Sequence, residues 1–570
     1  MGAKPHHHET AGELIQFHDL LLVNRTRRPG TPPTTEARPL AIDLLRAVND
    51  LQARDDFEVL GTSPICCIRP DECLSRAYNL WECKGAGTIQ SPLMRSITAL
   101  ALLAAALATT GCATFIDTPP APVQTALREA GVPATSLAVV AYPLEAPGTG
   151  LRLNADRPMA PASTMKTITA VVALDRLGPN SRGQTQLLAA GEVRDGRLDG
   201  PLVLKGGADA DLDWPALWAM LREVRERHGV RDLAGGIVVD RGLFNPARLD
   251  IDAPRFDEQA EFPYNVIPDA LHLNGSLLQY DLAADDRGLS VRPFPQFGGL
   301  AIDTSAVTLN DRPCKDWDDG WMPSRFEPLP GGGARLVLAG EFPRGCQVTQ
   351  SLNVLDRQWE TAQALRQLWG ALGGTLSGEI REGATPESAR VLAQHRDRPL
   401  AELLRPVMKA SDNALARLLF LRLGAAAAQP GEDTRQAAAR VVRDWFAAQQ
   451  IDTTGMTLEN GSGLSRAERA TAAQLAAMLR ASARGPHGPE LLATLPVAGV
   501  DGTLARRLKG TAAEGRARMK TGTLRDVVAL AGYVPDSTGR TWIVVAIVND
   551  DQAMKARPAI DALVDWVARR

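Results

Sequence analysis

Apolar runs of strand length occur near both ends of the region that follows residue 122. Ser136 to Tyr142 and Gly150 to Leu153 have the pattern of a strand pair. Val527 to Val534 and Trp542 to Asn549 form a second pair, separated by the turn residues 535–539. We therefore predict an antiparallel sheet assembled from both ends of this region.

Helical periodicity accompanies these strands. Apolar residues recur with helical spacing after Ser163 until Gly178-Pro179 ends the pattern; they are Met165, Ile168, Val171, Val172, Leu174 and Leu177. Ser163 is thus predicted at a helix N-terminus, with Lys166 on the same side of that helix. Residues 123–130 and 551–570 are expected to form two further helices that back the sheet.

The long middle of the chain has a pattern of its own. Short strand-like runs occur at 202–204, 236–239, 277–282 and 335–338, and residues 214–228 have the pattern of an amphipathic helix. This region is expected to be a mainly β insertion.

Composition narrows the function classes. The 570 residues include 63 basic and 66 acidic side chains, for a formal charge of -3. This balance gives no support to nucleic-acid binding, and no basic stretch is dense enough to suggest it locally. With 45% hydrophobic residues, the chain can form two or three domains with sizeable cores.

Three short motifs carry the candidate chemistry. They are Ser163-Thr164-Met165-Lys166, Ser411-Asp412-Asn413 and Lys520-Thr521-Gly522, in that order along a chain with only nine lysines. Together they match the S-x-x-K, S-D-N and K-T-G signature of penicillin-binding proteins and class A β-lactamases. Each motif alone also has a structural explanation, such as a solvated lysine or a helix cap, and only the combination is specific.

The motifs suggest a nucleophile and its base. Serine is a poor nucleophile at neutral pH and needs a base within hydrogen-bond reach. Lys166 can serve Ser163 only as a neutral amine, and burial beside another cation such as Lys520 would lower its pKa from about 10.4. We expect Ser411 to relay a proton to the leaving amine and Asn413 to bind an amide oxygen of the substrate.

The third motif suggests substrate binding. Lys520, Thr521 and Thr523 are expected to hold a free carboxylate, with Gly522 between them on the same strand. The backbone N–H groups of Ser163 and Thr523 are the expected oxyanion donors. No metal or other cofactor is expected.

Residues 94–112 have the features of a secretory signal peptide. Met94-Arg95-Ser96 precedes the apolar run 97–107, which is shorter than the ~20 residues of a membrane-spanning helix. Cys112 follows a glycine, as the lipid-attachment cysteine of bacterial lipoproteins does, whereas Thr109 stands where that signal usually has leucine. Lipid attachment at Cys112 and cleavage without lipidation both stay open.

A signal peptide that begins at Met94 raises the question of what precedes it. Residues 1–93 have little sustained periodicity, and they contain Cys66, Cys67, Cys73 and Cys83, whose spacing fits no standard zinc-ligand pattern. We interpret this segment as the result of a translation start placed too far upstream; a poorly ordered extension is the alternative.

Cys314 and Cys346 are the only cysteines beyond Cys112. In an exported protein a disulfide between them is expected, and closing the loop would contribute roughly 3 to 4 kcal/mol. Two free thiols are the alternative.

The motifs and their neighbours resemble the D-alanyl-D-alanine carboxypeptidase/endopeptidase family, the class C low-molecular-mass penicillin-binding proteins with a large insert. The resemblance extends over roughly 123–570. It rests on Ala410-Ser411-Asp412-Asn413, Asn460-Gly461-Ser462-Gly463-Leu464-Ser465-Arg466, Gly499-Val500-Asp501-Gly502-Thr503-Leu504 and Lys520-Thr521-Gly522-Thr523-Leu524.

The resemblance implies an α+β fold: a penicillin-binding/β-lactamase-like transpeptidase domain, with an antiparallel sheet flanked by helices, and a large mainly β inserted region. The interval between Ser163 and Ser411 is more than twice as long as that between Ser411 and Lys520. The insert is therefore expected in the first interval. We assign 122–188 and 390–570 to the catalytic domain and 189–389 to the insert.

The implied function is serine-type hydrolysis of D-Ala-D-Ala peptides or of cross-links in peptidoglycan stem peptides, through an acyl-enzyme on Ser163. Penicillins and other β-lactam antibiotics are the implied covalent inhibitors, and the implied location is the periplasm or cell envelope, with a lipid on Cys112 as the candidate membrane anchor. Two other functions stay open: a β-lactamase, although no E-x-x-L-N-like stretch follows Ser411, and a non-catalytic peptidoglycan-binding protein.

Overall fold

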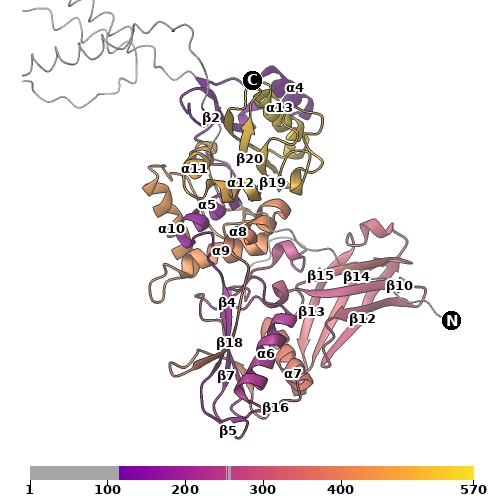
Figure 1. The fold of residues 1–570 in the computed structure, drawn as a ribbon. Coiled ribbons are helices and arrows are strands. Elements are labelled where there is room, and N and C mark those ends of the chain that lie inside the picture. The colour runs from indigo at the N-terminus through magenta and orange to yellow at the C-terminus, as the bar shows by residue number, and fades with distance from the viewer. Residues whose placement is uncertain (1–114, 252, 254–258) are drawn as a thin grey trace, which may run out of the picture. The chain divides into compact units, whose positions relative to one another are not determined.

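The computed structural model describes residues 115–251, 253 and 259–570. A six-stranded sheet takes its strands from both ends of this region, in the order β1-β3-β2-β21-β20-β19 (Figure 1). Its strands are β1 (Phe115–Ile116), β3 (Gly150–Leu153), β2 (Leu137–Pro143), β21 (Thr541–Asn549), β20 (Val527–Pro535) and β19 (Arg518–Leu524). The predicted antiparallel sheet forms, except that the short edge strand β1 pairs with β3 in parallel.

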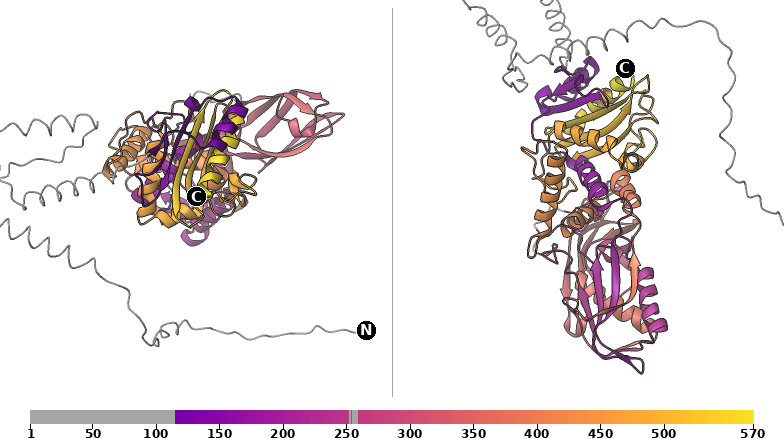
Figure 2. Two further views of the ribbon diagram at one scale, coloured as in Figure 1. Left: turned by 90° about the horizontal axis from the view of Figure 1, so that it is seen from above. Right: turned by 60° about the vertical axis from the view of Figure 1, so that its left-hand side comes forward.

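Both faces of this sheet are buried. On β2, Val139 belongs to a core shared with α4 (Ala121–Ala130) and α13 (Arg557–Ala568), whereas Val140 belongs to the core on the opposite face. Because successive side chains of a strand point to opposite faces, a continuous apolar strand can fill two cores. Figure 2 shows α4 and α13 together on one side of the sheet.

The C-terminal helix is shorter than the predicted range 551–570. It begins only at Arg557, after a 3-10 turn over Ala553–Ala556, and Pro558 occupies its first turn. Proline is favoured there because its missing N–H would have no helical partner at that position.

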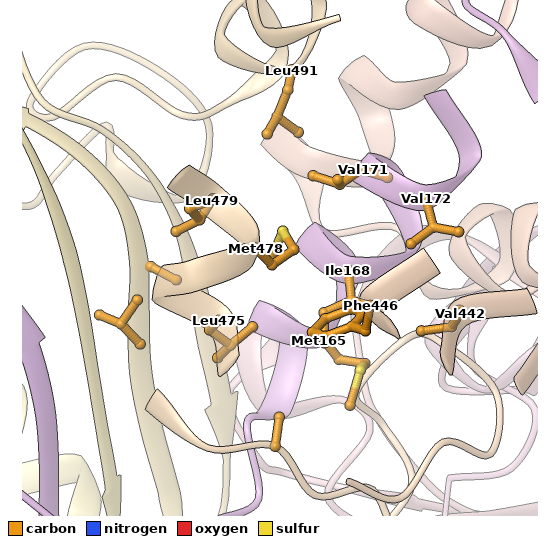
Figure 3. Close-up of a cluster of buried hydrophobic side chains, with 14 of the residues drawn as sticks. Met165, Ile168, Val171, Val172, Val442, Phe446, Leu475, Met478, Leu479 and Leu491 are labelled. Atoms are coloured by element: carbon orange, nitrogen blue, oxygen red, sulfur yellow. The ribbon is translucent and has the colours of Figure 1, made fainter. Parts of the chain in front are cut away.

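Helix α5 (Met165–Leu177) lies at the centre of the core on the other face, and every residue from Met165 to Leu174 is buried. Figure 3 shows its apolar side chains among those of three surrounding helices. The helices of this layer are α8 (Leu400–Arg405), α9 (Asn413–Ala425), α10 (Thr434–Ala448), α11 (Ala472–Arg484) and α12 (Gly488–Thr494). A helix buried on all sides is rigidly held, which suits it to carry reactive groups at its start.

The insert begins and ends inside one five-stranded sheet. Strand β4 (Gln184–Ala189) pairs antiparallel with β18 (Arg390–Arg396), so Gln184 lies opposite Arg396. The sheet order is β17 (Ile380–Glu382), β9 (Ile237–Asp240), β7 (Leu202–Gly207), β4 and β18. Strands β4 and β18 thus lie at the two ends of the segment 189–389 that is predicted as the insert, and β4 also pairs with β7 of that segment.

Helices α6 (Trp214–His228) and α7 (Arg357–Ala371) pack with this sheet. The range predicted for α6 agrees with the structure, and Asp213 caps it by accepting a hydrogen bond from the Ala216 N–H at 2.8 Å. A small four-stranded sheet adjoins, with β16 (Thr375–Leu376), β8 (Asp232–Leu233), β6 (Arg197–Leu198) and β5 (Val193–Arg194).

The remainder of the insert consists of two three-stranded sheets. The first has the order β11 (Gly288–Phe294), β10 (Leu278–Asp285) and β15 (Gln347–Leu352), and the second β12 (Leu300–Asn310), β14 (Ala334–Pro343) and β13 (Trp321–Pro328). A disulfide joins Cys314 to Cys346, with Cα atoms 5.2 Å apart. Strands β12 and β13 were missed in the sequence because most of their side chains are partly or fully exposed and lack apolar alternation.

Candidate active site

Ser163 lies in a tight turn just ahead of the buried helix α5. The turn is the 3-10 segment η3 (Ala162–Thr164), and α5 itself begins at Met165, two residues later than predicted. The Thr164 hydroxyl donates to the Pro161 carbonyl at 2.7 Å, and Ala162 has a positive φ of 44°. A non-glycine residue with positive φ is uncommon and marks a backbone that its surroundings hold in place.

Lys166 is fully buried one turn after Ser163. Its Nζ lies 2.9 Å from Ser163 Oγ, 2.6 Å from Asn413 Oδ1 and 2.6 Å from the Ser462 carbonyl oxygen. These contacts join three segments that are far apart in the chain, and they direct the amine at the serine hydroxyl.

Burial lowers the pKa of Lys166 to about 7. Desolvation is the main cause; the carboxylates of Glu468 and Asp412 oppose it, and the Arg417 guanidinium adds to the lowering. A substantial fraction of Lys166 is therefore neutral at physiological pH, as a general base must be.

Ser411 and Asn413 lie at a junction of two helices. Helix α8 continues into a π-helical turn over Pro406–Ala410, and Ser411 ends it in the left-handed conformation, with φ of 62°. Asp412 then caps α9 by accepting from the Leu415 N–H at 2.9 Å. Asn413, the first residue of α9, donates from Nδ2 to the Tyr264 carbonyl at 2.9 Å and accepts from Lys166.

Lys520 lies on β19 and is also fully buried. Its Nζ donates to Ser411 Oγ at 2.9 Å and to the Thr521 carbonyl at 2.8 Å. Burial lowers the pKa of Lys520 well below its usual value, and the nearby charge of Lys166 lowers it further.

Strand β19 passes very close to the turn that carries Ser163. A Cβ atom on Gly522 would lie 2.7 Å from the Pro161 carbonyl oxygen and 3.2 Å from the Ala162 Cβ. Only glycine leaves room for this approach, which accounts for the third residue of the Lys520-Thr521-Gly522 motif in structural terms.

These groups surround a cavity of about 410 Å³. It is lined by Ser163, Ser411, Asn413 and Thr523 from the predicted site, together with Tyr264, Gly463, Leu464, Leu524, Arg466 and Arg525. Thr521 is buried, and its hydroxyl donates to Thr503 Oγ1 at 2.7 Å. Of the two predicted threonine ligands for a carboxylate, Thr523 is the one that lines the cavity.

The sequence interpretation missed Glu468, which is buried beside the site. Its carboxylate accepts hydrogen bonds from four backbone N–H groups, at distances of 2.8 to 3.2 Å; the donors are Glu459, Asn460, Gly461 and Gly463. The loop so held presents the Ser462 carbonyl to Lys166. Gly461 and Gly463 both adopt positive φ in this loop. In the sequence, the two closely spaced glycines were the signal for such a tight turn.

Tyr264, Ser462 and Arg466 were also not predicted as site residues. Tyr264 belongs to the insert and reaches the site only through the fold, so no local pattern marks it. Cys112 and the ranges 1–93 and 94–112 lie outside the described residues. Within the described part of the chain, no helix is both long and apolar enough to cross a membrane.

Comparisons with known proteins identify the family of the chain. The family model of the D-Ala-D-Ala carboxypeptidase 3 (S13) family matches residues 122–570. A D-alanyl-D-alanine carboxypeptidase of Actinomadura sp. (strain R39) is 32% identical over 432 residues, covering 72% of this chain and 76% of that protein. The D-alanyl-D-alanine carboxypeptidase DacB of Haemophilus influenzae is 28% identical, covering 69% of this chain and 80% of its own length.

Solved structures support the fold. The crystal structure of penicillin binding protein 4 (dacB) from Haemophilus influenzae superposes with a TM-score of 0.65 at 23% identity, and it covers 78% of this chain and 98% of that one. The expected α+β fold, a transpeptidase-like domain with an additional β region, is confirmed. With a serine and a buried lysine in hydrogen-bond contact and a family model that spans most of the chain, the protein belongs to the D-Ala-D-Ala carboxypeptidase 3 (S13) family of serine hydrolases.

Proposed function

We propose that the protein hydrolyses the D-Ala-D-Ala terminus or the cross-link of peptidoglycan stem peptides, through an acyl-enzyme on Ser163. The observation that carries this proposal is the 2.9 Å contact between Lys166 Nζ and Ser163 Oγ, made by a lysine whose pKa is lowered to about 7. The relatives named D-alanyl-D-alanine carboxypeptidase indicate the substrate class.

The contacts of Lys166 fit a neutral amine. A neutral amine has two N–H donors and one lone pair, whereas the charged ammonium has three donors and no acceptor. Two of its three neighbours, Asn413 Oδ1 and the Ser462 carbonyl, can only accept. When the two N–H groups donate to these two acceptors, the lone pair of the amine points to the Ser163 hydroxyl. Lys166 then takes the hydroxyl proton as Ser163 Oγ attacks the substrate carbonyl.

Departure of the amine needs a proton, and Lys166 holds the one that it took from Ser163. Ser411 lies between the cavity and Lys520, which donates to it at 2.9 Å. We assign Ser411 the relay of this proton from Lys166 to the leaving nitrogen, and Lys520 the positive charge that favours binding of a substrate carboxylate. Thr523 lines the cavity and would bind that carboxylate, and the backbone N–H groups of Ser163 and Thr523 would hold the oxyanion.

The same site is expected to react with penicillins and to release them slowly. Hydrolysis of an acyl-enzyme needs a base that activates water. Lys166 can serve the peptide acyl-enzyme once the leaving amine has departed, whereas a ring-opened penicillin keeps its leaving nitrogen attached in the cavity. Among the described residues that line the cavity, none is a carboxylate that could act as a second base. The buried carboxylate of Glu468, whose charge acts on Lys166, already accepts four backbone hydrogen bonds. Nitrocefin turnover separates this proposal from a β-lactamase, which would turn it over rapidly.

The decisive experiment is covalent labelling with fluorescent penicillin. Ser163→Ala should abolish labelling while the unfolding transition stays unchanged, and Ser305→Ala, at an exposed serine of β12, is the control that should label normally. Undiminished labelling of Ser163→Ala would place the nucleophile elsewhere, and absence of labelling in the unaltered protein would favour a non-catalytic wall-binding role. Mass spectrometry of digested muropeptides then distinguishes removal of terminal D-Ala from cleavage of cross-links.

We further propose that the protein acts in the cell envelope and lacks residues 1–93, because translation starts at Met94. Cleavage of the signal peptide would then leave an N-terminus near Cys112. This rests on the signal-like segment 94–112. N-terminal sequencing of the envelope-located protein, together with mass analysis for a lipid on Cys112, tests it. Peptides from residues 40–84 in that protein would contradict the proposal.

A further inference from the structure

A second cleft lies in the insert, built by residues that play no part in the catalytic site. Its volume is about 1010 Å³, at the upper end of the roughly 300–1,000 Å³ typical of ligand pockets. Side chains from α6, α7, β10, β11 and β15 line it, and Figure 1 shows α6 and α7 beside the sheets of the insert.

Two aromatic side chains are exposed in this cleft. Phe294, at the end of β11, is 70% exposed, the largest exposed fraction among the large apolar residues that the structure describes. Trp218 of α6 is 38% exposed, and the guanidinium of Arg222 lies over its ring at 5.5 Å. A cation stacked on one aromatic ring restrains that ring, and so little entropy is lost when a ligand packs against it.

The floor of the cleft is polar and ordered by strand register. On β10, Gln279 lies opposite Phe294 of β11 and Ser351 of β15, which places the three in one row across the sheet. In the next row, Asp281 lies opposite Arg292 and Thr349, and the Thr349 hydroxyl donates to Asp281 at 2.7 Å. One aromatic side chain and five polar side chains thus share one face.

Most polar side chains of the cleft are neutral, and its few charged side chains include both signs. Amide side chains of Asn274, Gln279, Gln296 and Gln367 line the cleft, and its charged members are Asp213, Asp281 and Arg292. Amides both donate and accept, which suits hydroxyl and acetamido groups. This mixture gives no basis for binding a nucleic acid or a strongly charged partner.

The geometry points to this cleft as a binding site for the glycan strand of peptidoglycan, a neutral chain of N-acetylated amino sugars. Sugar rings have apolar faces that pack on aromatic side chains and equatorial polar groups that hydrogen-bond to amides and carboxylates. The choice of this polysaccharide rests on the proposed function, because the glycan is what carries the stem peptides.

The cleft is within reach of the catalytic cavity. Tyr264 lines the cavity, and Asn274, which lines the cleft, is ten positions further along the chain. Since a chain spans at most about 3.6 Å per residue, their Cα atoms are no more than about 36 Å apart. A strand bound in the cleft would raise the local concentration of its stem peptides at Ser163.

The test uses the whole protein with Ser163→Ala, which prevents cleavage, and a tetrasaccharide of β-1,4-linked N-acetylglucosamine as the probe. Calorimetry should detect binding that Phe294→Ala and Trp218→Ala each weaken about tenfold. Met322→Ala, at an exposed apolar residue of β13 outside this cleft, is the matched control and should bind normally.

Activity gives a second readout, with Ser163 restored. Phe294→Ala and Trp218→Ala should slow digestion of intact sacculi and leave hydrolysis of a short, glycan-free D-Ala-D-Ala peptide unchanged. Loss of short-peptide hydrolysis in the unaltered protein would count against the proposed function and not against the cleft.

Three results would overturn the inference. They are absence of tetrasaccharide binding, equal binding by Phe294→Ala and the unaltered protein, and a change from dimer to monomer in Phe294→Ala without any effect on the sugar. The last would identify the face as a self-association surface.

Discussion

Lys520 donates a hydrogen bond from Nζ to Ser411 Oγ over 2.9 Å, the same distance that separates Lys166 Nζ from Ser163 Oγ. Each of the two buried lysines therefore faces one serine. Burial lowers the pKa of both, and the charge of Lys166 lowers that of Lys520 further. The site disfavours two positive charges at once. A substrate carboxylate beside Lys520 would favour the charged form of Lys520, and Lys166 would then be the lysine that acts as the base.

This division predicts different outcomes for the same substitution. Lys166→Arg should lose acylation by at least ~100-fold, because arginine has a pKa above ~12 and cannot accept the serine proton. Lys520→Arg should keep residual acylation, since it preserves the positive charge that this position supplies. The measurement is the acylation rate with one penicillin, and equal losses in both variants would contradict the assignment.

The pKa of Lys166 predicts the pH dependence of acylation. Because the neutral amine is the active form and its pKa is lowered to about 7, the acylation rate should be low in acid, rise through about pH 7 and level off above it. Stopped-flow acylation across this range tests it. A rate that still rises steeply near pH 10 would mean that Lys166 keeps an ordinary lysine pKa.

Glu468 is predicted to act through Lys166 as a positioning residue. Its charge raises the pKa of Lys166, so Glu468→Gln should move the midpoint of the acylation profile to lower pH. It should also reduce the free energy of unfolding by about 1–3 kcal/mol, because buried backbone N–H groups lose a charged acceptor.

Glu192→Gln, at an exposed glutamate paired with Arg194, is the control for loss of one negative charge. An unchanged midpoint in Glu468→Gln, with normal folding, would limit Glu468 to a structural role.

Gly463 is predicted to hold the loop against the turn that carries Ser163. A Cβ atom there would lie 1.8 Å from the Ala162 carbonyl oxygen, and its φ is +79°. Gly463→Ala should slow acylation about 100-fold by displacing the nucleophile.

Gly431→Ala separates steric overlap from backbone strain. Gly431 has nearly the same φ, +80°, but no atom within 4 Å of the added Cβ. This variant should lose roughly 1–2 kcal/mol of stability and acylate normally. Similar acylation rates in the two variants would contradict the role of close packing at Gly463.

The sequence alone determined the local elements of this protein. Residues 214–228 form the predicted helix and 150–153 the predicted strand, because periodicity of 3.6 or 2 and flanking turn residues are local signals. The three motifs, which are read without any structure, contain Ser163, Ser411 and Asn413 of the cavity lining and the two buried lysines that contact them. The additional β region was also expected, from the long interval between Ser163 and Ser411.

Only the tertiary structure decided how these groups act. Lys166 meets Asn413 and Ser462 from segments hundreds of residues away, and its pKa depends on burial that no local pattern encodes. The left-handed conformation of Ser411, the four backbone bonds to Glu468 and the approach of Tyr264 from the insert arise in the same way. A sequence pattern specifies which face of an element is apolar, whereas desolvation and hydrogen-bond distances exist only once distant elements have packed together.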